Sequence, residues 1–251
     1  MISGYTYIQD GIANDYCFEE CIRSLRQACD EVVVGIAESV DGTRERVEAL
    51  AMEVGNTIRI IPYGRIGPEE RNPNCITAWM NNVRQHCRHP YQFALDADEV
   101  LPEWHIPTLR SHAERKDCIW FARLNFWGNT VRLAPAGTVC GEAVVRAGPT
   151  YLWMPSDEPH PEGEPEIRQR AIHSGMAIFH YGFLRKEDAF YRKSKFLQPL
   201  LVGSYDSRLT AAEKSGQKWV DTIRFDRDFG SYTGPHPAVA LNWLKDRGYT
   251  P

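Results

Sequence analysis

The sequence predicts an α/β fold in which helices flank a mostly parallel central sheet. Over the first hundred residues, short β-rich runs alternate with segments of helical periodicity. The run EVVVGIA at 31–37 is apolar at nearly every position, which is typical of a strand covered on both faces. Strands that alternate with helices predict a parallel sheet joined by right-handed crossovers.

The first elements follow in regular order. The β-rich run GYTYIQ at 4–9 predicts the first strand. Residues 16–29 predict a helix, because Phe18, Ile22 and Leu25 recur there at helical spacing. The strand at 31–37 comes next, so a strand, a helix and a strand open the chain.

The alternation continues to residue 97. Asp41-Gly42-Thr43 is a turn and a helix start, and the segment after it is rich in strong helix formers. A third strand, a loop rich in Gly, Pro and Asn, a helix and a fourth strand complete this half. The five predicted segments lie at 44–54, 57–63, 64–74, 75–88 and 91–97.

The pattern changes after residue 105. Longer β-rich stretches at 118–133 and 142–148 predict antiparallel strands around a Gly-Asn turn. The acidic, proline-rich segment 154–166 predicts a loop, because proline interrupts both helix and sheet. The run MAIFHYGF at 176–183 predicts a further strand, and a helix follows it.

These patterns predict one domain in two halves with a polar tail. The division places a nucleotide-binding half at 1–105 and an acceptor and catalytic half at 106–205. Residues 206–251 are expected to pack on the core, with Trp219 and Trp243 as anchors.

The composition is that of an ordinary globular protein of 251 residues, 43% hydrophobic and 25% charged. The formal net charge of −4 argues against a dedicated nucleic-acid coat, although a local basic face is compatible with it. None of the seven cysteines forms a CxxC pair, so reduced and mostly buried thiols are expected. No run approaches the roughly 18 apolar residues of a membrane span, and a cytoplasmic protein is expected.

Acidic residues follow two of the predicted parallel strands. Glu38–Asp41 comes after the strand at 31–37, and Asp96–Glu99 comes at the end of the strand at 91–97. Ligands of such sheets bind beyond the carboxyl ends of the strands. The two acidic clusters are therefore expected to face one crevice.

Asp96 and Asp98 are the first candidates for chemistry. In an extended stretch, positions two apart point to the same side, so both carboxylates could meet one cation. Mg²⁺ and Mn²⁺ prefer oxygen ligands and commonly bridge phosphates. The alternative is a strand that ends in solvated acids and caps the next turn.

The segment ALDADEVL at 94–101 resembles the DxD region of GT-A glycosyltransferases, especially those of family 2. The opening strand, the helix after it and the segment DEVVVGIAESVDGT are similar to the start of that family. Asn81 matches an asparagine that these proteins often carry in the helix before the DxD strand. RLNFWGN, EAVVRAG and FHYGFLR are similar to later blocks, and the resemblance covers about residues 3–195.

The resemblance implies a GT-A fold whose N-terminal half binds a nucleotide-diphosphate sugar, with a UDP-sugar favoured. Glu38 and Asp41 would contact the base or the ribose, and Asn81 would belong to the same donor site. Asp96 and Asp98 would hold Mn²⁺ or Mg²⁺ against the diphosphate, with Asp98 the more direct ligand. For Asp41, plain turn and helix-start chemistry is the alternative.

Three residues after the DxD region carry further implied roles. His180 would complete the metal site, although a structural histidine at a strand end is the alternative. Lys186 and Lys193 lie seven apart, so a helix places them on one face, where they could neutralise the departing phosphate. The alternative is a solvated helix face interleaved with Glu187 and Asp188.

The implied chemistry is an inverting transfer of a hexosyl or pentosyl group, and it needs a general base. That base takes a proton from the acceptor hydroxyl as the hydroxyl attacks the anomeric carbon. Asp157 in MPSDEPHP is the candidate, with Glu158, Glu142 and Asp188 as alternatives. The acceptor is left open among a saccharide, a lipid-linked sugar, a protein and, less favoured, a modified base in DNA.

Two other functions stay open at this point. One is a module that binds a nucleotide or a sugar without turnover. The other is a nucleotidyltransferase, which also uses paired carboxylates and a metal ion. That reaction predicts a glycine-rich phosphate loop near the first strand, where YTYIQDGIAND offers one glycine.

Overall fold

The structure, a computed structural model, describes eight segments of the chain. These are residues 1–53, 55, 57–67, 73–135, 143–148, 171–197, 214–216 and 227–250. Several predictions fall outside the described residues: the loop at 154–166, the candidate bases Asp157, Glu158 and Glu142, and the anchor Trp219.

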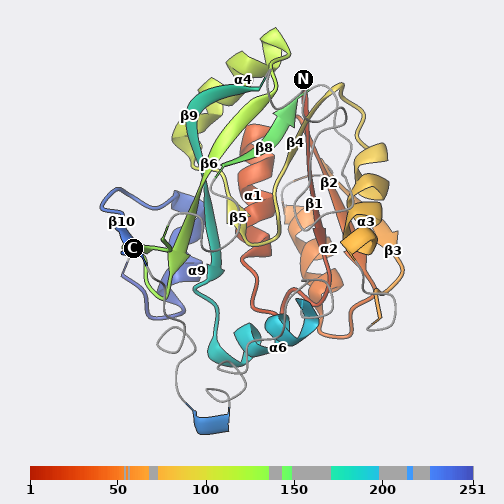
Figure 1. The fold of residues 1–251 in the computed structure, drawn as a ribbon. Coiled ribbons are helices and arrows are strands. Elements are labelled where there is room, and N and C mark those ends of the chain that lie inside the picture. Colours follow the sequence, from red (N-terminus) through yellow and green to blue (C-terminus); the bar gives the residue numbers. More distant parts are fainter. Residues whose placement is uncertain are drawn as a thin grey trace.

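The first half forms the parallel sheet that the sequence predicts (Figure 1). Four strands lie in the order β4-β1-β2-β3, and every neighbouring pair is parallel. The strands are β1 (Ile2–Ile8), β2 (Glu31–Ala37), β3 (Ile58–Tyr63) and β4 (Tyr91–Ala94). The helices between them are α1 (Phe18–Ala28), α2 (Thr43–Glu53) and α3 (Pro73–Gln85).

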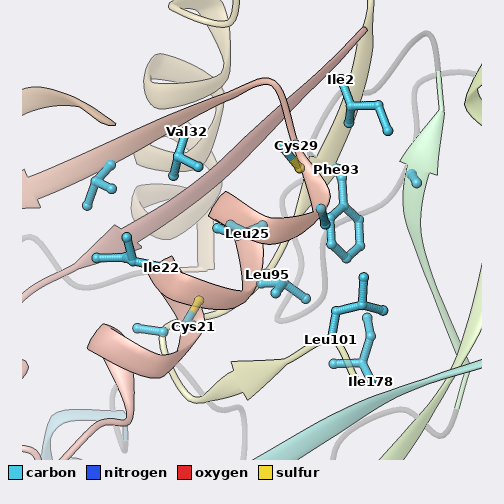
Figure 2. Close-up of a cluster of buried hydrophobic side chains, with 14 of the residues drawn as sticks. Ile2, Cys21, Ile22, Leu25, Cys29, Val32, Phe93, Leu95, Leu101 and Ile178 are labelled. Carbon is cyan, nitrogen blue, oxygen red and sulfur yellow. The ribbon is translucent and has the colours of Figure 1, made fainter. Parts of the chain in front are cut away.

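Both faces of this sheet are buried, as the apolar run of β2 predicts. Val32 and Val34 belong to a core cluster that includes Ile22 and Leu25 of α1, part of which Figure 2 shows. Val33 joins a second cluster, built around α3. The alternating sides of one strand therefore pack against helices on opposite faces.

Gly35 sets how closely α3 approaches the sheet. A Cβ atom at this position would lie 2.1 Å from Cγ2 of Val83 on α3. A larger residue would push the helix off the strand, so the glycine inside an otherwise apolar strand has a packing reason.

The second half extends the same sheet with mainly antiparallel pairs. β8 (Ala143–Gly148) pairs antiparallel with both β4 and β6 (Ile119–Trp127), as predicted. β9 (Ile172–Phe183) pairs parallel with β6 and antiparallel with β5 (Glu99–Val100). The α/β class and the mostly parallel sheet with its antiparallel part are thus confirmed, and one sheet contains strands from both sides of residue 105.

The remaining elements are short or lie at the edges of this sheet. They are the helices α4 (Ile106–Arg115), α6 (Glu187–Leu197) and α9 (Leu241–Lys245), the strands β7 (Arg132–Leu133) and β10 (Gly230–Ser231), and 3₁₀ turns at Glu103–His105 and Ala238–Ala240. Figure 1 shows α6 at the edge opposite the N-terminus, where the parallel strands end. None of the described helices is long and apolar enough to cross a lipid bilayer.

Among the described C-terminal residues, Trp243 packs on the body of the protein. Trp243 is buried, and its ring lies 6.0 Å from that of Tyr181 on β9. Arg247 stacks on Trp243 and forms an ion pair with Asp15, which follows β1. The end of the described chain therefore contacts the loop after β1, which lies at the carboxyl ends of the parallel strands.

Candidate functional site

The acidic segment after β4 closes a tight turn. The amide of Glu99 donates to the carbonyl of Asp96 at 2.9 Å, and the Glu99 carboxylate accepts from the Asp96 amide at 2.9 Å. β4 ends at Ala94, so the predicted extension of the strand to residue 97 is wrong. Because the backbone turns here, the carboxylates of Asp96 and Asp98 meet different partners.

Asp98 is buried and meets cations of the chain itself. Its Oδ2 accepts hydrogen bonds from Nη2 of Arg185 and Nζ of Lys193, each at 2.7 Å. Burial alone would raise the pKa of this carboxyl, but Lys193, His180 and Arg185 hold that pKa well below its usual range. Asp98 is therefore an ionised, fully desolvated carboxylate at neutral pH.

Asp96 and Glu99 share a second pair of cations. Nη2 of Arg146 lies 2.7 Å from Asp96 Oδ2 and 3.1 Å from Glu99 Oε1. Nε of Arg123 lies 2.8 Å from the same Glu99 oxygen. Burial would raise the pKa of Glu99, but Arg146 and Arg123 lower it. These ion pairs fasten the turn to β6 and β8, which carry the two arginines.

Asp96 is the most accessible acid of the turn. Its side chain is 25% exposed, whereas that of Asp98 is 7% exposed. The other oxygen of Asp96 lies 3.4 Å from the hydroxyl of Tyr7, whose pKa is raised well above its usual value by burial and by Asp96. The protonated phenol donates to the carboxylate, and a ligand outside the turn meets Asp96 first.

Strand register brings His180 to the same turn. On β9, His180 stands opposite both Glu99 of β5 and Asn125 of β6. Its Nδ1 donates to Oδ1 of Asn125 at 2.8 Å, and its Nε2 lies 3.5 Å from Oδ1 of Asp98. In the neutral imidazole, this bond to Asn125 leaves the lone pair of Nε2 on the side of Asp98.

Gly182 packs closely against this pair. A Cβ atom at Gly182 would lie 2.4 Å from Nε2 of His180 and 3.0 Å from Oδ2 of Asp98. Any side chain at this position would therefore intrude on the facing atoms of His180 and Asp98.

The loop after β1 forms hydrogen bonds with Arg185 and with the backbone of Lys186. Arg185 donates to the carbonyl of Asn14 at 2.9 Å, and the amide of Lys186 donates to Asp15 Oδ2 at 2.8 Å. Asp15 has a left-handed backbone with φ of 52°. These contacts fix the loop beside the turn that holds Asp98.

The acids after β2 lie at the same edge of the sheet, with different local partners. Asp41 accepts hydrogen bonds from the Thr43 amide, the Thr43 hydroxyl and the Ala13 amide at 3.1, 2.6 and 2.8 Å. Asp41 thus starts α2 and braces the loop after β1, which is the turn role considered as the alternative. Glu38 has an exposed side chain, and its carbonyl accepts from Arg65 at 2.9 Å.

The other predicted residues are less closely joined to the turn. Asn81 lies on α3, where its Oδ1 accepts a long bond of 3.4 Å from Arg84. Lys186 has an exposed side chain, unlike Lys193, which reaches Asp98 directly. Asp188 is an exposed residue of α6, 3.4 Å from Arg192.

The structure adds site residues that the sequence reasoning did not single out. They are Tyr7, Arg123, Asn125 and Arg146, and Arg185 gains a specific partner. A signal for two of them was present, because Arg123 and Arg146 stand inside apolar strand runs. An arginine in such a position predicts a buried counter-ion.

Comparison with known proteins gives partial similarity to solved structures. No family model matches the sequence, and no curated protein matches it. S. aureus TarS 1-349 is 10% identical over 80% of this chain and 66% of that chain, with a TM-score of 0.44. The alignment with S. aureus TarS covers 58% of this chain and 28% of that chain at 12% identity, with a TM-score of 0.39.

A second group of similar structures comes from Mycobacterium tuberculosis. Its glucosyl-3-phosphoglycerate synthase, crystallised with Mn²⁺, UDP and phosphoglyceric acid, is 16% identical over 51% of this chain and 43% of that chain, with a TM-score of 0.32. TarS 1-349 has been crystallised with UDP and with UDP-GlcNAc. This chain spans 28% of the length of the S. aureus TarS chain.

Proposed function

We propose that this chain is a family 2-like GT-A glycosyltransferase that uses a divalent cation. It moves a hexosyl or pentosyl group from a UDP-sugar to a hydroxyl acceptor with inversion. The observation that carries this proposal is the pair formed by Asp98 Oδ1 and His180 Nε2, which face each other at 3.5 Å.

The donor set fits Mn²⁺ or Mg²⁺. In the neutral imidazole, His180 Nε2 and Asp98 Oδ1 each offer a lone pair, so the two atoms could bind one cation together. Asn125 accepts a hydrogen bond from Nδ1 of His180 and so orients the ring. Metal-binding histidines commonly have such a partner on the nitrogen that does not bind the metal. The ammonium of Lys193 already stands as a cation on the other oxygen of Asp98.

Asp98 and His180 would supply two ligands, whereas Asp96, which the sequence predicts as a further ligand, pairs with Arg146. Among the described residues, no group of three or more His, Cys, Asp or Glu side chains is placed to hold a metal ion. Mg²⁺ commonly keeps several waters and takes substrate phosphates as further ligands. When bound, the ion would stabilise negative charge on the donor's diphosphate.

The chain's own residues would bind and orient the donor. Lys193 would meet the phosphate that leaves with the nucleotide, and Arg185 keeps the neighbouring loop in place through Asn14. Glu38, Asp41 and Asn81 remain the candidates for the base and ribose, with Asp41 acting through the loop that it braces. Lys186 is a further candidate for the phosphates.

The acceptor hydroxyl would lose its proton to a carboxylate as it attacks the anomeric carbon. Asp157 is the proposed general base. Asp188, an exposed residue of α6 that lies 3.4 Å from Arg192, is the alternative among the described residues. The acceptor class stays open between a saccharide and a lipid-linked sugar.

A donor screen tests this proposal. Thermal shift is measured with UDP-glucose, UDP-GlcNAc, UDP-galactose and UDP-xylose, each with and without Mn²⁺, and released UDP is then quantified. We expect one donor to stabilise the protein only with the cation and to release UDP. Stabilisation without release under any saccharide acceptor would favour a non-catalytic binding module, and no stabilisation by any donor would overturn the proposal.

A further inference from the structure

Two cations meet the same oxygen of Asp98, but they are held very differently. Arg185 has a side chain only 1% exposed, and it also donates to the carbonyls of Gly182 and Asn14 at 2.6 and 2.9 Å. Lys193 has a side chain 22% exposed. Arg185 is thus a fixed part of the core, whereas the ammonium of Lys193 can be solvated if it leaves Asp98.

Tyr16 lies beside both cations, with Cζ of Arg185 4.7 Å from the centre of its ring. Nζ of Lys193 lies 5.0 Å from the centre of the Tyr16 ring, within the range of a cation–π contact. Release from Asp98 would therefore leave Lys193 beside an aromatic face and near water. The side chain of Lys193 is more exposed than that of Arg185, so Lys193 is the one of the two cations that can leave Asp98 for water or a ligand.

A divalent cation on Asp98 would conflict with this resting arrangement. The ammonium lies 2.7 Å from Oδ2 of the carboxylate whose Oδ1 faces His180. Like charges a few ångströms apart repel strongly in a desolvated site. A diphosphate, which is negative, would attract the same ammonium away from the carboxylate.

We propose that Lys193 is a displaceable counter-ion that couples donor binding to metal binding. In the donor-free protein, its ammonium neutralises Asp98 and lowers the affinity for a divalent cation. When UDP arrives, the ammonium moves to the diphosphate and leaves Asp98 to the cation. This proposal rests on the proposed function and adds a reason for the two ligands to bind together.

The test measures Mn²⁺ binding by electron paramagnetic resonance, with and without UDP, for wild type and Lys193→Met. In Lys193→Met we expect Mn²⁺ alone to bind about tenfold tighter, because one of the two cations on Asp98 is removed and only Arg185 remains. In wild type, UDP raises the affinity for Mn²⁺ by some factor, and in Lys193→Met we expect this factor to be about tenfold smaller. The factor by which Mn²⁺ raises the affinity for UDP should become smaller by the same amount. Lys193→Arg keeps the charge and should bind Mn²⁺ alone as wild type does.

Lys245→Met provides the matched control, since it removes the same charge from an exposed position on α9. Suppose that wild type binds Mn²⁺ and UDP together, but Lys193→Met binds Mn²⁺ alone no more tightly than wild type does. This result would overturn the counter-ion role and leave the proposed function intact. Failure of wild type to bind Mn²⁺ even with UDP would overturn both.

A measurement on wild type does not depend on the variant's folding. In crystals grown with Mg²⁺ and UDP, we expect Nζ of Lys193 within hydrogen-bond distance of a phosphate oxygen and beyond that distance from Asp98. An ammonium that stays on Asp98 beside bound Mg²⁺ and UDP would overturn the proposal.

Discussion

Asn125 fixes which nitrogen of His180 faces the acidic turn. Nδ1 of His180 donates to Oδ1 of Asn125 at 2.8 Å, and the opposite nitrogen faces Asp98 at 3.5 Å. The two residues stand on neighbouring strands in register, so the ring is held by the sheet itself. A mobile loop could not orient the imidazole as firmly.

The first prediction concerns the loss of the hydrogen bond between His180 and Asn125. Asn125→Leu should weaken Mn²⁺-dependent UDP binding by about tenfold to a hundredfold, because the imidazole loses its orientation. Isothermal titration calorimetry measures the change. Asn242→Leu, at an exposed position on α9, is the control and should bind as wild type does. Equal affinity in Asn125→Leu and wild type would contradict the ligand role of His180.

The second prediction adds a methyl group beside the pair. The Cβ of Gly182→Ala would lie 2.4 Å from His180 Nε2, so the imidazole must shift away from Asp98. Mn²⁺-dependent stabilisation by UDP, measured as a thermal shift, should be lost. Gly64→Ala meets no atom within 4 Å and should retain the full shift. A retained shift in Gly182→Ala would place the cation elsewhere.

The third prediction concerns the buried acid of the turn. Glu99→Gln should lower the free energy of unfolding by about 3–5 kcal/mol near neutral pH, because Arg123 and Arg146 lose their buried counter-charge. The pKa of Glu99 is lowered by the arginines, so this stabilisation is present above the ordinary carboxyl pKa and is lost as pH falls through the lowered value.

Urea unfolding of Glu99→Gln and wild type from acid to neutral pH measures this difference. The same substitution at the exposed Glu53 of α2 should leave stability almost unchanged. A Glu99→Gln protein as stable as wild type at neutral pH would show that the arginines are satisfied without it.

The fourth prediction is a pH dependence at Glu20 on α1. Burial raises the pKa of this carboxyl to about 7. A raised carboxyl pKa means that the folded state holds its proton more tightly than the unfolded state, so stability falls as pH rises from about 4.5 to about 7. Glu20→Gln should therefore be more stable than wild type by about 3 kcal/mol near pH 8 and equal to it near pH 4. Thermal unfolding at both pH values decides, and a difference independent of pH would contradict it.

The parallel half of the fold was predictable from local pattern. The strand at 31–37 matches β2 residue for residue, because an apolar, β-branched run bounded by acids has no competing helical period. The alternation of strands and helices also predicted that Asp41 and Asp98 lie at the same edge of the sheet, where the parallel strands end. The strand before Asp96 was predicted too long, since the hydrogen bonds that close the turn come from the Asp96 and Glu99 groups themselves.

The partners of the acids were not predictable in the same way. Arg146 lies 50 residues from Asp96, and Arg185 lies 87 residues from Asp98. Both arginines are visible in the sequence, but periodicity assigns a residue to a face and does not say which residue of another strand stands opposite.

By itself, the sequence determined the α/β class, the alternation of helices with parallel strands along the chain and the presence of acids at the carboxyl edge of those strands. Local backbone preference and hydrophobic period suffice for these, since each is read within one element. Only the tertiary structure decided that Asp98 pairs with Lys193 and Arg185 and faces His180. Those pairings depend on strand register and on how α6 packs, which the buried core sets through contacts distant in the chain.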